Sequence, residues 1–142
     1  MQSTLTRVVL ALLAVAGAWI GGWAALFPRW FFDEFPGFGR RWTAVDGPYN
    51  EHLVRDVGGF FLALGVIAGV AAVVGTVVLA RIVGLGWLVI SVPHAAYHFT
   101  HLHVYDTLDQ VLTVVSLSAG VVASLWVLLF PGRKERAPEP PG

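Results

Sequence analysis

Histidine is concentrated in one short stretch of this chain. Four of its five histidines, His94, His98, His101 and His103, fall within ten residues at the end of a long apolar segment. Residues four and seven apart share one face of a helix, so His94, His98 and His101 form a stripe and His103 points away from it. Ionisable groups at the margin of a hydrocarbon layer are costly, and such clusters mark functional sites by default. This stretch is therefore the first candidate for chemistry.

The fifth histidine, His52, lies beside a second group of ionisable residues. Glu51, Arg55 and Asp56 surround it at the edge of another apolar segment. On a helix, His52 and Asp56 share one face, with Arg55 on its flank. Adjacent residues on a helix do not face each other, so Arg55 and Asp56 need partners elsewhere. We expect Arg55 to pair with Asp109 of the last apolar segment, and Asp56 to pair with a histidine.

Three apolar segments therefore present polar faces, and these faces are expected to meet. Polar residues in membrane helices almost always face the bundle interior or a water-filled cavity. If neighbouring helices pack these faces together, they form a pocket that opens outward. Its predicted lining is His52, Asp56, His94, His98, His101, Asp109 and Gln110.

The histidine stripe has the ligand types and the spacing of a metal site. Histidine is the commonest protein metal ligand, and spacings of three and four residues on a helix let two imidazoles reach one ion. His94, His98 and His101, with Asp56 or Asp109, would suit zinc, non-haem iron or copper. We therefore expect a transition metal at this stripe. The expected supporting residues around it are Glu51, Arg55, Asp109 and Gln110.

Haem is the second cofactor that these residues suit. Two histidines from facing helices, for example His52 and His98, would hold a single haem. With either cofactor, the chain would be a small oxidoreductase or an accessory subunit of one. The chain has no cysteine, which excludes thiolate ligands and cysteine-based redox chemistry.

The same residues also allow a function without metal. Histidines at a membrane interface can hydrogen-bond neighbouring helices, or hold Asp56 and Asp109 in neutral pairs. The chain would then be a proton-linked small permease, or a structural or assembly subunit, in which the histidines titrate but bind no metal. The sequence leaves both interpretations open.

The elements that position these residues follow from the composition. Hydrophobic residues make up 56% of the 142, and charged residues only 13%, against about 25% in soluble domains. A spanning helix needs about 20 mostly apolar residues. Gaps between charges predict an all-α membrane domain over 1–132, a bundle of four transmembrane helices with Arg81 at the tight turn between the second and third. The predicted spans are about 8–27, 57–80, 82–101 and 109–130.

Two further segments lie outside the predicted spans. The 28–50 segment interleaves aromatic and charged residues, a pattern typical of a loop lying in the interface plane. We therefore predict an aromatic-rich interfacial loop between the first two spans. The short proline-rich tail, 133–142, is predicted to be disordered and cytoplasmic.

The distribution of charge predicts where the protein resides. An even number of spans places both termini on one side of the membrane. Five basic residues, Arg81 among them, lie on the side of the termini, against four in the opposite loops, which favours cytoplasmic termini in a plasma membrane. The expected partners are the lipid bilayer and other membrane proteins. The nine acidic and nine basic residues balance, so nucleic acid is not an expected partner.

Two motifs carry a resemblance to known proteins. The stretches 48–59, PYNEHLVRDVGG, and 93–102, PHAAYHFTHL, resemble small uncharacterised four-helix membrane proteins of actinobacteria. More remotely, the layout is similar to the DoxX-like group, which has four spans, a long first loop, and an arginine near a Gly-Gly pair at the start of the second span. The resemblance implies the four-helix fold and the importance of both motifs. Some DoxX-like proteins are associated with quinone-linked oxidation, and no active-site residue is carried over from them.

Overall fold

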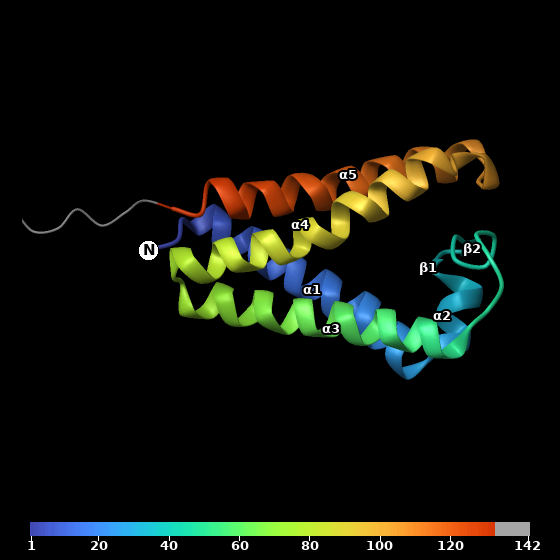
Figure 1. The fold of residues 1–142 in the computed structure, drawn as a ribbon, viewed down its shortest axis with the longest axis horizontal. Helices are drawn as coiled ribbons and strands as arrows, with labels where there is room; N and C mark the ends of the chain where they lie inside the picture. Colours follow the sequence, from blue (N-terminus) through green and yellow to red (C-terminus); the bar gives the residue numbers. More distant parts are fainter. Residues whose placement is uncertain (133–142) are drawn as a thin grey trace, which may run out of the picture.

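A computed structural model describes residues 1–132 of the chain. Four long helices run roughly along one axis (Figure 1). All four are long and apolar enough to cross a membrane, and the chain is therefore a multi-pass membrane protein. This confirms the predicted all-α bundle of four transmembrane helices. The helices are α1 (Thr4–Leu26), α3 (Glu51–Val74), α4 (Val77–Thr100) and α5 (Thr107–Leu129).

Each long helix begins at a polar residue just outside its apolar segment. The side chains of Ser3, Asn50, Thr76 and Asp106 each accept a hydrogen bond from the backbone N–H three residues ahead. These are the residue types that best satisfy the free donors of a first helical turn. The helix starts are therefore encoded locally.

The charge pattern predicted the turn between the second and third spans at Arg81. In the structure, α3 and α4 are joined earlier, at Gly75 and Thr76. Gly75 has a φ of 77°, the left-handed conformation that commonly ends a helix and that glycine adopts without steric penalty. Thr76 then caps α4. Arg81 lies inside α4, in its second turn. Its exposed side chain is compatible with that position, since an arginine near a helix end can extend to the membrane interface. A charge alone therefore did not locate the chain reversal.

The helices pack as two close pairs, α1 with α3 and α4 with α5. A Cβ atom on Gly17 of α1 would lie 2.7 Å from the Cα of Gly65 of α3. Such a clash shows that glycine is required for the two backbones to approach this closely. Gly84 plays the same part between α4 and α5, since its Cβ would lie 2.7 Å from the backbone nitrogen of Leu128.

Both ends of the described chain meet at one end of the bundle, here called the closed end. The Gln2 amide donates to the carbonyls of Ala71 and Thr76, at 3.0 and 2.8 Å. The Thr6 hydroxyl, which is fully buried, donates to the carbonyl of Phe130 at 3.0 Å. The main apolar core lies between this end and the middle of the bundle. Its buried members include Leu10, Leu13, Ala68, Val83, Trp87 and Val127.

The loop between α1 and α3 covers the opposite end of the bundle. It contains the short helix α2 (Pro28–Glu34) and a small antiparallel hairpin of β1 (Pro36–Gly37) and β2 (Arg40–Arg41). Phe31 and Phe32 are buried against the ends of α1 and α3. The aromatic-rich loop is therefore confirmed, and the hairpin within it was not predicted. The tail predicted to be disordered, 133–142, lies outside the described residues.

Candidate functional site

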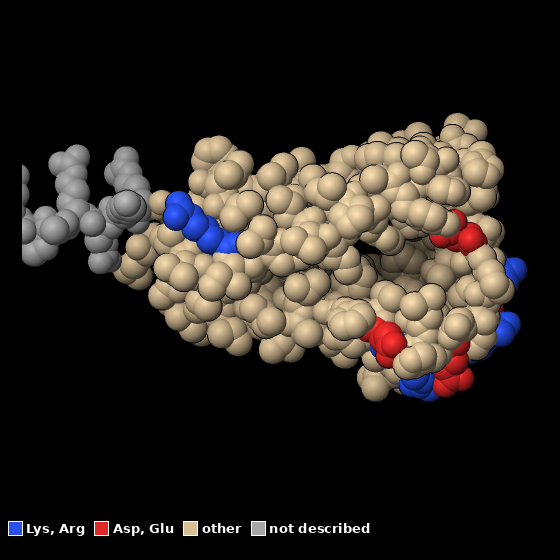
Figure 2. Space-filling view, viewed as in Figure 1, with Lys and Arg blue, Asp and Glu red and all other residues tan. Residues whose placement is uncertain are grey.

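The two helix pairs separate at the end opposite the termini, here called the open end (Figure 1). Figure 2 shows a hollow between the pairs at this end, with acidic side chains on both of its sides. The histidine-bearing end of α4 lies here, as do the starts of α3 and α5 and the aromatic loop. The candidate site must therefore be built from these four elements.

His98 of α4 is the histidine that joins several elements together. Its Nδ1 lies 3.2 Å from the hydroxyl of Tyr105, which precedes α5. That hydroxyl donates to the backbone carbonyl of Trp42 in the loop, at 3.4 Å. The ring of His94, one turn earlier, meets the His98 ring edge to face with centroids 4.6 Å apart. A chain of polar contacts thus runs from α4 through Tyr105 to the loop.

Within these polar contacts, Tyr105 is a neutral phenol. Its side chain is almost fully buried, at 6% exposed. Burial raises the pKa of Tyr105 to about 12, and the carboxylate of Asp46 acts in the same direction. The hydroxyl therefore keeps its proton across the physiological range. If that proton is donated to the Trp42 carbonyl, the phenol oxygen accepts from His98 Nδ1–H, and Nε2 of His98 is left as an acceptor.

A carboxylate of the loop, Asp46, contacts the histidine-bearing helix α4. The Tyr97 hydroxyl donates to Asp46 at 3.5 Å, which joins α4 to the loop a second time. Tyr97 also stacks on His101, with ring centroids 4.2 Å apart. Nδ1 of His101 lies 2.8 Å from the carbonyl of Tyr97. His101 is therefore held at the end of its own helix, because α4 ends at Thr100.

The ionisable residues at the start of α3 contact one another and the end of α1. His52 lies 3.4 Å from Asp56 within the same helix, and their side chains are 87% and 49% exposed. Arg55 donates to Glu51 at 2.9 Å and to the carbonyl of Ala25 at 2.6 Å. Arg55 thus joins the start of α3 to the end of α1. The predicted pairing of Arg55 with Asp109 was wrong, whereas Asp56 does pair with a histidine.

Asp109 has a different partner, which the sequence did not reveal. Its carboxylate forms an ion pair with Arg40 of the hairpin. Gln110, next to it, donates to the carbonyl of Tyr105 at 3.0 Å. Asp109 and Gln110 therefore support the Tyr105 region. In the sequence, Arg40 is marked only as one of two adjacent arginines in the aromatic loop. That loop has no periodicity from which its contact with Asp109 could be predicted.

The proposed ligand set for a metal is divided between two places. His94 and His98 are adjacent on α4, while Asp56 contacts His52 on α3. Within residues 1–132, no three His, Asp or Glu side chains are grouped so that they could hold a metal ion. The geometry also offers little to a haem held by His52 and His98, because the His52 side chain is almost fully exposed.

Comparison with protein-family models, curated proteins and solved structures finds no match to this chain. The site is therefore interpreted from its own geometry. It joins α4, the start of α5 and the aromatic loop through His98, Tyr105, Trp42, Asp46 and Tyr97.

Proposed function

We propose that this protein is a proton-linked binding or transport protein, in which protonation of His98 controls how the aromatic loop closes the open end. The observation that carries the proposal is the contact chain from His98 through Tyr105 to Trp42. It joins α4, the start of α5 and the loop. Histidine is the side chain whose ordinary pKa, about 6.5, lies nearest to physiological pH.

Protonation of His98 would add a positive charge at Nε2 without reversing this contact chain. A charged imidazole can only donate, so the Tyr105 hydroxyl still accepts from His98 Nδ1–H and donates to the Trp42 carbonyl. The added positive charge also lies one residue from Tyr97, whose hydroxyl reaches Asp46. Attraction to this carboxylate would draw the loop towards α4. The protonated form is therefore the closed one, and the neutral form leaves the hollow more accessible.

A metal function is supported by one specific observation. The rings of His94 and His98 lie 4.6 Å apart on successive turns of α4, a spacing at which two imidazoles can reach one ion. His101 and Asp56 would have to move to complete the predicted set, or a partner membrane protein would have to supply the remaining ligands. The measurable consequence is a stoichiometric transition metal, or a haem absorption band, in the purified protein.

The charge distribution supports cytoplasmic termini in a plasma membrane. Within residues 1–132, the acidic residues all lie at or near the open end, whereas Arg7 and Arg81 lie towards the closed end. Positive residues favour the cytoplasmic side. The histidine end would then face outward. The likeness to the DoxX-like group belongs to the same proposal and rests on the layout of four spans with a long first loop.

Carbon-13 labelling of histidine tests the proposal directly, because the chain has only five histidines. In lipid nanodiscs, the His98 ring signal should change with pH. A Tyr105→Phe variant should shift its midpoint and leave the exposed His103 unchanged. A His98 signal with no titration, or one indifferent to Tyr105→Phe, would contradict the proposal. Bound zinc, iron or copper that is lost together with His98 would favour the metal function instead.

A further inference from the structure

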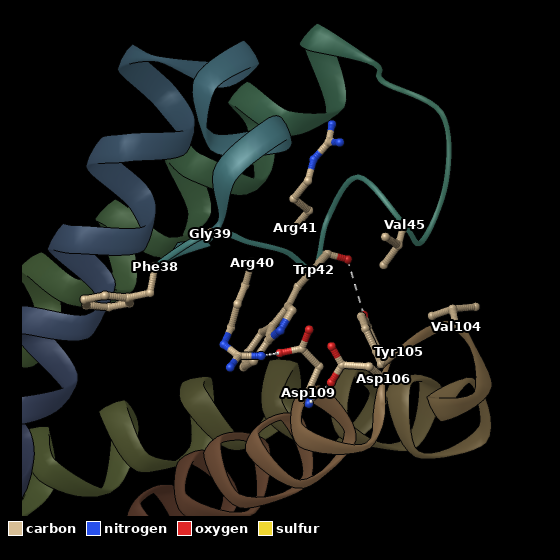
Figure 3. A pocket seen from close by; sticks show the side chains of 10 residues that line it. All are labelled: Phe38, Gly39, Arg40, Arg41, Trp42, Val45, Val104, Tyr105, Asp106 and Asp109. Atoms are coloured by element: carbon tan, nitrogen blue, oxygen red, sulfur yellow. Dashed lines mark hydrogen bonds and ion pairs between the residues drawn. The ribbon is translucent and has the colours of Figure 1, made fainter.

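Two hollows meet at the small hairpin of the loop. One is a polar cavity of about 320 Å³ between the hairpin and the start of α5. The other is an apolar groove of about 550 Å³ along α1. Phe38, at the tip of the hairpin, lines both hollows and is 99% exposed. In Figure 3 its ring extends towards α1, while Arg40 and Trp42 extend towards α5. The hairpin thus separates a polar site from an apolar one.

The polar cavity presents charges of both signs beside aromatic rings. Arg40 enters it from the hairpin, and Asp106 and Asp109 enter from the start of α5 (Figure 3). The rings of Trp42 and Tyr105 form a further wall, with centroids 6.4 Å apart. The indole N–H of Trp42 is buried and has no hydrogen-bond partner within the described part of the chain. The cavity therefore presents charged side chains of both signs beside an aromatic wall.

The charges in the cavity favour a ligand that is itself zwitterionic. Arg40 is paired with Asp109 through one of its nitrogens, which leaves other guanidinium N–H donors for a phosphate. Asp106 uses one carboxylate oxygen to cap α5, and its other oxygen makes no hydrogen bond or ion pair within residues 1–132. A carboxylate beside the faces of Trp42 and Tyr105 is a suitable place for an ammonium group.

The apolar groove is suited to a hydrocarbon chain. Its walls include Trp19, Trp23 and Trp30, and Gly22 forms part of its floor. From Ala18 to Phe27 it follows α1 for about 14 Å along the helix axis. The groove lies on a helix that is long and apolar enough to span a membrane, next to a tryptophan-rich interface loop. Hydrocarbon is the solvent that surrounds such a surface.

We propose that the two hollows together bind one phospholipid with a zwitterionic, amine-bearing head group. The phosphate contacts Arg40, the ammonium lies among Asp106, Trp42 and Tyr105, and an acyl chain follows the groove along α1. Asp106 caps a helix that is about 34 Å long, slightly more than the hydrocarbon thickness, which places it at head-group depth. The charge of the cavity and the apolar groove on the other side of Phe38 both fit this occupant.

The head-group half is tested by Asp106→Asn. Asparagine caps a helix as well as aspartate does, so the variant removes the charge and keeps the start of α5. Native mass spectrometry of the detergent-solubilised protein would measure binding of phosphatidylethanolamine and phosphatidylglycerol. The wild type should prefer phosphatidylethanolamine, and Asp106→Asn should weaken that binding roughly tenfold. Glu34→Gln, the same change of charge at an exposed residue outside both hollows, should bind like the wild type.

The acyl-chain half is tested by filling the groove. A Cβ atom on Gly22 would meet nothing within 4 Å, so Gly22→Leu occupies the groove without disturbing the helix packing. Gly59→Leu, at an equally open glycine on α3, is the matched control. Gly22→Leu should abolish phosphatidylethanolamine binding, and Gly59→Leu should retain it.

Two outcomes would overturn the proposal. One is binding of both phospholipids by Gly22→Leu and Asp106→Asn with wild-type affinity. The other is full displacement of the lipid by soluble phosphoethanolamine at equal concentration, since the groove would then contribute nothing. Lipid binding is compared among the variants at one fixed pH, whereas the proton-linked function is measured from the change of the histidine signals with pH, so failure of this proposal is distinguishable from failure of the proton-linked function.

Discussion

The closed and open ends of the bundle are held together by different kinds of contact. At the closed end, buried groups such as the Thr6 hydroxyl join α1 to the last turn of α5, and an apolar core lies directly behind them. At the open end, the loop reaches α4 and α5 through side chains such as Arg40, Tyr97 and Tyr105. The two helix pairs are therefore packed against each other at the closed end and bridged by the loop at the open end.

This difference indicates where the molecule can move. Backbone packing of the kind seen at Gly17 and Gly65 cannot be adjusted gradually, because any side chain there would meet the neighbouring backbone. Single hydrogen bonds and partly exposed ion pairs each contribute only about 0.5–1.5 kcal/mol. The open end can therefore change its contacts without unfolding of the packed end.

The largest expected effect lies in the α1–α3 packing. Gly58→Leu should destabilise the protein by about 3 kcal/mol or more, because its Cβ would overlap the backbone of Ala24 and Ala25. Gly59→Leu, at the next position, should have little effect, since its Cβ meets nothing within 4 Å. Thermal unfolding in detergent measures both. Equal melting temperatures would show that the close helix pair is not what stabilises the fold.

A smaller loss of stability is expected at the closed end. Thr6→Val removes the buried hydroxyl that donates to the Phe130 carbonyl, and should cost about 1–2 kcal/mol. The exposed Thr4→Val serves as the control and should unfold like the wild type. Chemical denaturation followed by tryptophan fluorescence would compare the two. A stable Thr6→Val protein would remove the distinction between the ends.

Tyr105→Phe should act only locally at the open end. Loss of its hydroxyl contacts should weaken the loop by about 1 kcal/mol, seen as faster hydrogen exchange over 40–50 with unchanged exchange at 71–76. Uniformly faster exchange would contradict the independence of the two ends.

Alkaline pH gives a second measure of the same contact. Because the pKa of Tyr105 is raised from 10.0 to about 12, its stabilising contribution is complete below pH 10 and is lost as the pH rises towards 12. The free energy of unfolding should therefore fall more in the wild-type protein than in Tyr105→Phe between pH 10 and 12. Identical alkaline titrations of the two proteins would show that this phenol is not held in its neutral form.

The smallest effect is expected at the hairpin. Arg40→Gln should destabilise the protein by no more than about 1 kcal/mol, since the Arg40 and Asp109 side chains are partly exposed. Its effect should shrink in high salt, which screens exposed charges. A loss that is large and independent of salt would place the ion pair in a desolvated environment and make the open end as rigid as the closed one.

The bundle could be predicted from the sequence because long apolar segments and their polar caps are local signals. The turn at Gly75 was missed because the conspicuous signal nearby was the charge of Arg81, which an exposed helix position accommodates. The polar face of α4 was predicted as a continuous stripe, yet His101 departs from it because the helix ends at Thr100. Periodicity holds only as far as the helix continues.

The partners of the histidines could not be predicted for a different reason. Asp46, Trp42 and Arg40 belong to a loop without periodicity, so their positions depend on how the hairpin folds over the open end. Asp56 and Asp109 were expected to meet the histidine stripe, but each has a nearer partner, His52 and Arg40 respectively.

The open end is expected to respond to protons, and the closed end is not. Because the chain contains no cysteine, pairs of spin labels can be introduced cleanly. Electron–electron distances would be measured in nanodiscs from about pH 5.5 to 8, a range that spans the ordinary histidine pKa. Labels at Gly47 and Leu108 report on the open end, and labels at Val73 and Leu129 on the closed end. We expect a shorter and narrower distance distribution for the open pair at low pH, a change that His98→Gln abolishes, and no change for the closed pair. Distances that stay constant at both ends, or that change equally at both, would contradict it.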